Sequence, residues 1–190
     1  YVFLTGSRGH LANKDKLWIN GRVSGGLVGN IESSGKVSVR NSFASTTING
    51  TASVGGLVGT SAGELSVEHS YADSYLTSAG YAGGLLGRGD DQSVLKIKDA
   101  YAAGFITGGT SFGIAGKTLN AGDSIENVYT ACAPLDENDR ALDYSTVSGI
   151  NGGVGNNVYY LCNSNTNAIG ELRSWKSSDR QTVAETLGSA

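Results

Sequence analysis

One short phrase recurs four times in this chain at an almost constant spacing. The phrase is GGLVG at Gly25–Gly29 and Gly55–Gly59, GGLLG at Gly83–Gly87, and FGIAG at Phe112–Gly116. Its second residue falls at 26, 56, 84 and 113, so the intervals are 30, 28 and 29 residues. A period of this length, kept over most of a chain, predicts a repeat architecture in which each unit buries its apolar face only against its neighbours.

A second series of markers runs half a period away from the first. Each marker places an aromatic residue two positions after a polar one, as in NSFA at Asn41–Ala44 and HSYA at His69–Ala72. The aromatic residues of this series are Phe43, Tyr71, Tyr101, Tyr129 and Tyr159, which step by 28, 30, 28 and 30 residues. Stacked repeats are therefore expected to align these rings in one column.

The residues between the two markers alternate between apolar and polar types, which is typical of strands with one wet face. KVSVR at Lys36–Arg40 and ELSVE at Glu64–Glu68 show this alternation most clearly. A second short strand follows each aromatic residue, and the glycine phrase supplies a third. Three short strands in a period of roughly 29 residues predict an all-β fold, a right-handed parallel β-helix (β-solenoid) of about five coils. Two columns of apolar residues are expected to point inward: Ile48, Leu76 and Ile106, and Val39, Val67, Ile97 and Ile125.

The continuous repeat predicts one domain over residues 1–190. We expect an N-terminal edge at 1–16, coils over 17–162 with an irregular insertion at 135–154, and a short cap at 163–190. A cap is needed because an uncovered solenoid end exposes unpaired strand edges.

Two details of the ends follow from the apolar residues there. Trp18, in the first strand at Lys14–Asn20, is expected to cover the open end of the core. Leu172, Trp175, Val183 and Leu187 make the segment Ile169–Ser189 compatible with a helical cap.

The polar residues of the second marker form one predicted column at a bend, namely Asn41, His69, Asp99, Asn127 and Asn157. Asn and Asp suit bends because their side chains bond nearby backbone and tolerate left-handed φ. We interpret this column as a structural ladder, since mostly neutral amides are a poor set of metal ligands.

The charge and hydropathy of the chain exclude several classes of partner. The formal net charge is −3, and no basic run exceeds two residues, which argues against nucleic acid and anionic membrane surfaces. No stretch of 18 apolar residues exists, so no membrane insertion is expected. The start, Tyr1–His10, lacks the pattern of a signal sequence, and we expect the chain to be a piece of a larger parent polypeptide.

The sequence offers few groups for catalysis. His10 and His69 are the only histidines, and no nucleophile, zinc or EF-hand motif accompanies them. Polysaccharide-cleaving β-helices use clustered carboxylates, and the acidic clusters here are Asp90–Asp91 and the group Asp136, Glu137 and Asp139. We interpret both as solvated loop charge, so we expect no enzyme activity and no cofactor, with a calcium ion near Asp136 and Asp139 as the alternative.

Two sets of residues are candidates for ligand binding. Arg88, Gly89 and Asp90 spell the integrin-binding tripeptide at a variable corner, where a simple Gly- and Asp-rich turn is the other interpretation. Tyr75 and Phe105 are expected to stack on the outward face of the second strand, as a platform for a sugar ring or a partner side chain.

The two cysteines hold the same place in consecutive repeats. Cys132 follows Tyr129 by three residues, and Cys162 follows Tyr159 by three, so both belong to the column of small residues Thr46, Ser74 and Gly104. A coil spacing of ~4.8 Å suits the Cα separation of a disulfide. We predict a Cys132–Cys162 disulfide; the alternative is a pair of buried thiols that only stack.

The alternation of GGLVG-type phrases with NSFA, HSYA and DAYA over about Leu17–Tyr160 resembles the GLUG repeat of bacterial surface and secreted proteins. That repeat occurs in adhesin-like proteins and in some IgA-specific metallopeptidases. The fourth unit departs from the pattern, with Phe112 in place of the first glycine.

The resemblance implies an extracellular module and carries no catalytic residues to transfer. It favours a non-enzymatic structural or adhesive role, with a host or bacterial surface protein or glycan as partner. An ancillary module of a secreted enzyme such as a peptidase is the alternative, and a polysaccharide-cleaving β-helix is a third.

Overall fold

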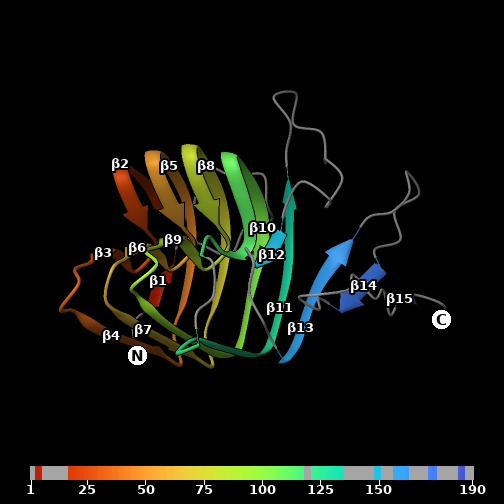
Figure 1. The fold of residues 1–190 in the computed structure, drawn as a ribbon. Helices are drawn as coiled ribbons and strands as arrows, with labels where there is room; N and C mark the ends of the chain where they lie inside the picture. The colour runs from red at the N-terminus through yellow and green to blue at the C-terminus, as the bar shows by residue number, and fades with distance from the viewer. Residues whose placement is uncertain are drawn as a thin grey trace.

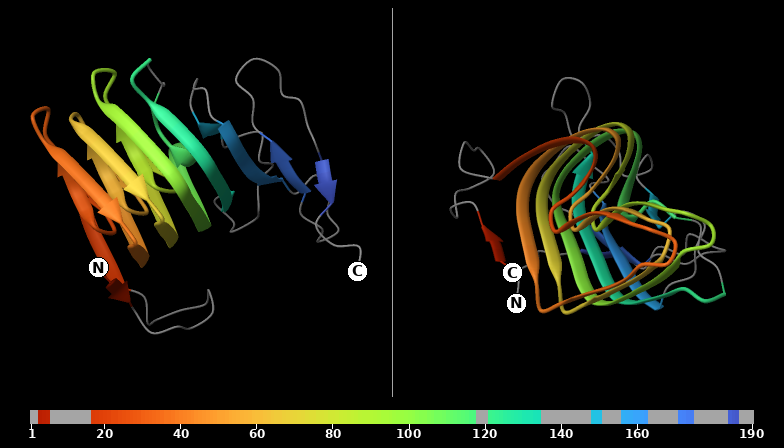
Figure 2. Two further views of the ribbon diagram at one scale, coloured as in Figure 1. Left: turned by 90° about the horizontal axis from the view of Figure 1, so that it is seen from below. Right: turned by 90° about the vertical axis from the view of Figure 1, so that its left-hand side faces the viewer.

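The computed structural model describes residues 3–5, 17–117, 121–134, 148–150, 156–162, 171–174 and 184–186. The elements assigned within these residues are strands, and most of them stack in parallel as a β-solenoid of about 4 turns (Figure 1). The predicted all-β, parallel β-helical fold is confirmed. Successive coils superpose when the stack is seen end-on, in the right-hand panel of Figure 2. No helix able to span a membrane occurs in this described part of the chain.

Each coil contributes three stretches of strand to the solenoid. The first stretch is long and comprises β2 (Leu17–Gly25), β5 (Phe43–Gly55), β8 (Tyr71–Gly83) and the second half of β10 (Val94–Ala115). The second stretch follows the glycine phrase and comprises β3 (Val28–Ile31), β6 (Val58–Ser61) and β9 (Leu86–Gly89). The third is the alternating run, with β4 (Lys36–Arg40), β7 (Glu64–Glu68) and the first half of β10; β11 (Ser124–Pro134) and β13 (Asn156–Cys162) extend the stack.

The two markers found in the sequence set the register of the stack. Phe43 pairs with Tyr71, Tyr71 with Tyr101, Tyr101 with Tyr129, and Tyr129 with Tyr159. β5 and β8 stay aligned residue by residue, whereas β2 on β5 and β10 on β8 each contain one register shift, between Gly21 and Val23 and between Gly108 and Thr110.

The glycine phrase is required because the coil is narrow at this point. A Cβ atom built on Gly56 would lie 2.1 Å from the carbonyl oxygen of Gly84 and 2.5 Å from the Cβ of Ala72. The same clash, at 2.6 Å, would arise between Gly84 and Ala102. The phrase therefore lies directly against the alanine that follows each aromatic residue, and this contact explains why the two markers recur together.

The two predicted core columns point inward, as expected. Ile48, Leu76 and Ile106 are buried, and so are Val39, Val67, Ile97 and Ile125. The column of small residues is also internal: Thr46 and Ser74 share a hydrogen bond of 3.0 Å, and Cys132 is buried in the same column.

The N-terminal strand differs from the prediction in two ways. Trp18 does not cover the core; it pairs with Thr47, points outward and is 57% exposed, because its neighbour Ile19 aligns with the inward Ile48. In addition, β1 (Phe3–Thr5) pairs with Phe43–Ser45 of β5. β2 pairs with the next part of β5, beginning with Leu17 opposite Thr46. Phe3 therefore occupies the first place in the register of the aromatic column.

The C-terminal end is not helical where the structure describes it. β14 (Glu171–Ser174) and β15 (Ala184–Thr186) are strands, and β14 runs antiparallel to β13. A strand satisfies the exposed backbone groups of the last coil, which a helix cannot do.

Most of the insertion at 135–154 lies outside the described residues. Its described part, β12 (Ser148–Ile150), pairs in parallel with β10 near Phe112.

Replacing Leu76 with Ala tests the core column. The variant should lose about 2–4 kcal/mol of unfolding free energy, because a large buried side chain leaves a cavity in a slender core. Thr77→Ala, on the exposed side of the same strand, should change stability by less than about 0.5 kcal/mol. Urea denaturation of both variants provides the measurement, and equal losses would contradict the inward orientation of Leu76.

Candidate functional site

The outward side of the long sheet carries a ladder of stacked aromatic rings. The ring centroids of Phe43 and Tyr71 are 5.0 Å apart, those of Tyr71 and Tyr101 4.7 Å, and those of Tyr101 and Tyr129 5.0 Å. Neighbouring rings are parallel within 8°. The predicted column is therefore confirmed for these four rings, while the side chain of Tyr159 lies outside the described part.

The ladder lies on the outer surface rather than in the core. Tyr129 is 42% exposed, and the other three rings are partly buried. Burial between its neighbours raises the pKa of Tyr101 to about 12. The ring faces cover one another, so the ladder offers ring edges and tyrosine hydroxyls to the solvent.

A second aromatic column runs beside the ladder. Tyr75 and Phe105 stack at 4.9 Å with an interplanar angle of 30°, as predicted, and Trp18 lies in the same register column through Thr47. The two columns are four residues apart along each strand, which corresponds to ~13 Å. We call this surface the aromatic face; it comprises Trp18, Phe43, Tyr71, Tyr75, Tyr101, Phe105 and Tyr129.

The polar bend column is a structural ladder, as interpreted from the sequence. All five of its residues have positive φ, between 47° and 53°. Asn127 Nδ2 donates to Asp99 Oδ1 at 2.9 Å, and Asn157 Nδ2 donates to Asn127 Oδ1 at 2.9 Å. From Asp99 to Asn157, each coil thus bonds the next through the residue that makes its turn.

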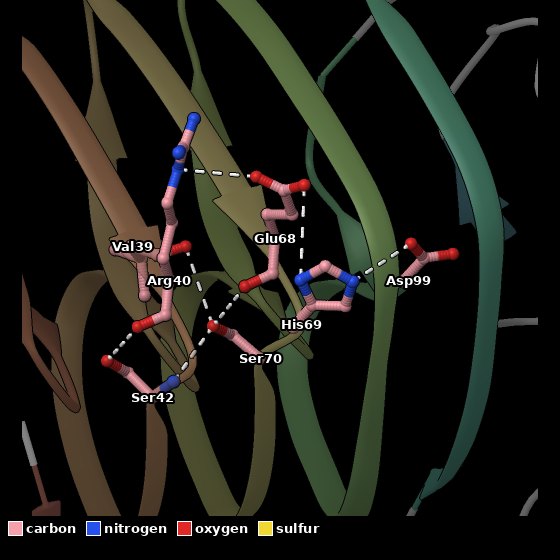
Figure 3. A network of polar contacts seen from close by, with 7 residues as sticks. All are labelled: Val39, Arg40, Ser42, Glu68, His69, Ser70 and Asp99. Atoms are coloured by element: carbon pink, nitrogen blue, oxygen red, sulfur yellow. Dashed lines mark hydrogen bonds and ion pairs between the residues drawn. The ribbon is translucent and has the colours of Figure 1, made fainter. Parts of the chain in front are cut away.

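His69 belongs to this ladder and is engaged on both sides (Figure 3). Its Nε2 lies 3.3 Å from Asp99 Oδ2, and its Nδ1 lies 3.9 Å from Glu68 Oε1. Glu68 in turn pairs with Arg40 at 3.3 Å, one coil away.

The serine beside His69 takes part in a separate set of bonds. Ser70 Oγ donates to the Glu68 carbonyl at 2.8 Å and accepts the Ser42 amide at 3.1 Å. The bond between Ser42 and Ser70 joins neighbouring coils at the bend, whereas the bond to Glu68 lies within one coil (Figure 3).

The integrin-type tripeptide lies at the end of β9, where the chain enters a corner. Arg88 Nε lies 4.0 Å from Asp90 Oδ1, and the Arg88 guanidinium lies over the Tyr81 ring, 5.2 Å from its centroid. The two charged side chains of the tripeptide therefore contact each other.

A pocket of about 420 Å³ opens at this corner. It is lined by Tyr81, Arg88, Gly89, Asp90, Asp91, Phe112, Gly116 and Lys117. We call it the corner pocket. The sequence singled out the tripeptide, Asp91 and Phe112 separately, but it did not bring them together with Tyr81, Gly116 and Lys117, because these residues come from strands that meet here through the coil geometry.

A buried ion pair behind the corner pocket was also missed. The Lys117 ammonium bonds to Asp123 Oδ2, and both side chains are fully buried. Asp123 Oδ1 accepts the Leu95 amide at 2.7 Å. Lys96 pairs with Ser124, so Asp123 takes the place of the buried Leu95 in the next coil. The signal in the sequence was therefore a charged residue at a place that is apolar one coil earlier.

The metal and disulfide candidates have different outcomes. Among the described residues no group of three potential ligands could hold a metal ion, and Asp136, Glu137 and Asp139 lie outside them. Cys132 is a free, buried thiol in the structure, and burial raises its pKa to about 12. The side chain of Cys162 lies outside the described part, so the disulfide stays a prediction.

Comparison of the chain with protein-family models, with curated proteins and with solved structures finds no match in any of the three.

Replacing Asn127 with Ala or with Gly separates its two roles at the bend. Both variants lose the side-chain bonds to Asp99 and Asn157, but only Ala strains the left-handed backbone. The Ala variant should therefore be less stable than the Gly variant by about 1 kcal/mol. Thermal or urea unfolding measures this difference. Equal stabilities would show that the left-handed φ at position 127 does not disfavour Ala relative to Gly.

Titration of the thiols tests the state of Cys132. In the folded, reduced protein Cys132 should not react with a soluble thiol reagent at neutral pH, because the thiol is buried and its pKa is raised. Denaturation of the reduced protein should expose two thiols per chain. Denaturation without reductant should expose none if the disulfide forms, whereas two thiols would contradict the disulfide.

Proposed function

We propose that this chain is a non-enzymatic structural and adhesive module of a bacterial cell-surface or secreted protein. In this proposal the β-solenoid is a rigid support, and the aromatic face binds a protein or glycan on a host or neighbouring cell. The extracellular location and the adhesive role follow from the resemblance to the GLUG repeat.

The observation that supports binding is the position of the aromatic residues. The core columns and the bend ladder already account for the fold, yet Trp18, Tyr75 and Phe105 lie outside the core on one register column. Trp18 is 57% exposed. Exposed aromatic side chains on a rigid sheet offer large contact area at small cost in conformational entropy, which is the usual composition of binding hot spots.

We assign no catalytic role to the charged residues at the bend, because their side chains pair with one another in the stack. His69, Glu68 and Asp99 bond to residues of neighbouring coils. Arg40, Glu68, Lys98 and Glu126 alternate in charge along one register row, which stabilises the stack. These contacts support a structural use of the charges at the bend.

The double variant Tyr75→Ala with Phe105→Ala tests the proposal. Binding of the full chain to arrays of glycans and surface proteins, and to whole cells, should identify ligands. For a ligand held at the aromatic face, the double variant should weaken affinity roughly thirty-fold, as expected for a loss of about 2 kcal/mol at a hot spot.

The matched control changes two outward residues on another side of the solenoid, Ser38→Ala with Ser66→Ala, and should bind as the unmodified chain does. Cleavage of an acidic polysaccharide by the purified chain would contradict the non-enzymatic role.

A further inference from the structure

Departures from the repeat gather at one place, the corner pocket. Equivalent positions in stacked coils have the same backbone environment, so the repeat shows which residue the fold requires. Tyr81 aligns with Ser53, Arg88 with Thr60, and Phe112 with Gly83. Three side chains larger than their counterparts thus meet around one cavity.

Phe112 shapes the pocket without disturbing the coil. The backbone of the fourth phrase keeps its bonds: Gly84 N donates to the Phe112 carbonyl at 3.0 Å, and Leu85 N donates to the Ile114 carbonyl at 2.8 Å. The Phe112 ring lies over Gly116, where a Cβ atom would be 2.8 Å from the ring. It also lies parallel to Tyr81, within 8°, at a centroid distance of 6.4 Å.

The polar groups at the rim include both donors and acceptors. The Arg88 guanidinium is held by Asp90 and by the Tyr81 ring, and its side chain is 53% exposed. Asp90 and Asp91 are exposed at the corner, where Asp90 N is fixed by the Ser61 carbonyl at 2.9 Å. The Lys117 ammonium is turned away and buried against Asp123, so it adds no accessible positive charge.

We infer that the corner pocket binds a neutral sugar residue, such as a hexose of a glycan chain. Sugar hydroxyls both donate and accept, so they match the carboxylates of Asp90 and Asp91 together with the Arg88 guanidinium. Arg88 covers the face of the Tyr81 ring, so Tyr81, which is 36% exposed, offers its ring edge as an apolar contact and its hydroxyl as a further donor and acceptor. The volume lies within the range of small-molecule sites.

Other ligand classes fit these groups less well. An anion meets two carboxylates and a guanidinium that is already paired. An ammonium group would lie beside Arg88, which repels it and already covers the Tyr81 ring. A wholly apolar ligand would leave the charged rim groups desolvated without partners.

This site is separate from the aromatic face. Tyr81 follows Tyr75 by six positions on β8, which corresponds to ~20 Å along a strand. The inference therefore goes beyond the proposed function, and each of the two can fail while the other holds.

Variants that restore the repeat test the inference with little risk to folding. Tyr81→Ser with Arg88→Thr introduces the residues that Ser53 and Thr60 provide one coil earlier. The full chain is screened on a glycan array that contains neutral, acidic and amino sugars. The affinity for the sugars it binds is then measured by calorimetry with free monosaccharides and disaccharides.

We expect binding of neutral sugars, a loss of affinity of tenfold or more in the repeat-restoring variant, and no change in the control variant Ser38→Ala with Ser66→Ala. Amide chemical shifts of Gly89 and Gly116 should move when the sugar is added. The inference is overturned by selective binding of acidic or amino sugars, or by unchanged affinity in the repeat-restoring variant. It is also overturned if no neutral sugar binds up to about 10 mM, the limit of a very weak site.

Discussion

The contact on which this solenoid depends is the close approach of the glycine phrase to the alanine column across the core. Gly56 leaves no room for a Cβ atom beside Ala72 and the Gly84 carbonyl, and the same restriction recurs at Gly84 against Ala102. A larger residue at either position would force the two sides of the coil apart and break the register with the coils above and below. The low content of bulky side chains in the sequence follows from this narrow cross-section.

A narrow core also determines where large side chains can go. The ladder of Phe43, Tyr71, Tyr101 and Tyr129 stacks on the outer surface, where coil spacing alone brings the rings to 4.7–5.0 Å. The polar bend adds a second ladder, made of side chains that also allow the left-handed turn. Both ladders add attraction between coils outside the core, so a slender structure gains cohesion from its surface.

Most of the repeat region could be predicted from the sequence, because a fixed period places equivalent residues in one column. The inward orientation of Leu76, the left-handed bend at Asn127 and the stacking of Tyr75 on Phe105 all follow from that rule. The ends could not be predicted in this way, since the outward Trp18 and the antiparallel β14 depend on pairing partners that the period does not specify. The buried pair of Lys117 and Asp123 was missed because each charge is acceptable only in the presence of the other.

A repeat also provides an internal control for function. Some residues differ in type from their counterparts in the neighbouring coils. Such a difference is either balanced by a second one nearby, as in a buried ion pair, or has no role in the fold. Lys117 and Asp123 compensate each other, and removing one partner would leave a buried charge at a cost of about 3–5 kcal/mol. Phe112 is buried and forms a wall of the corner pocket, while Tyr81 and Arg88, which replace Ser53 and Thr60 of the coil before, face the solvent there. Departures that the fold does not require, and that converge from two coils on one cavity, are the ones best explained by a ligand.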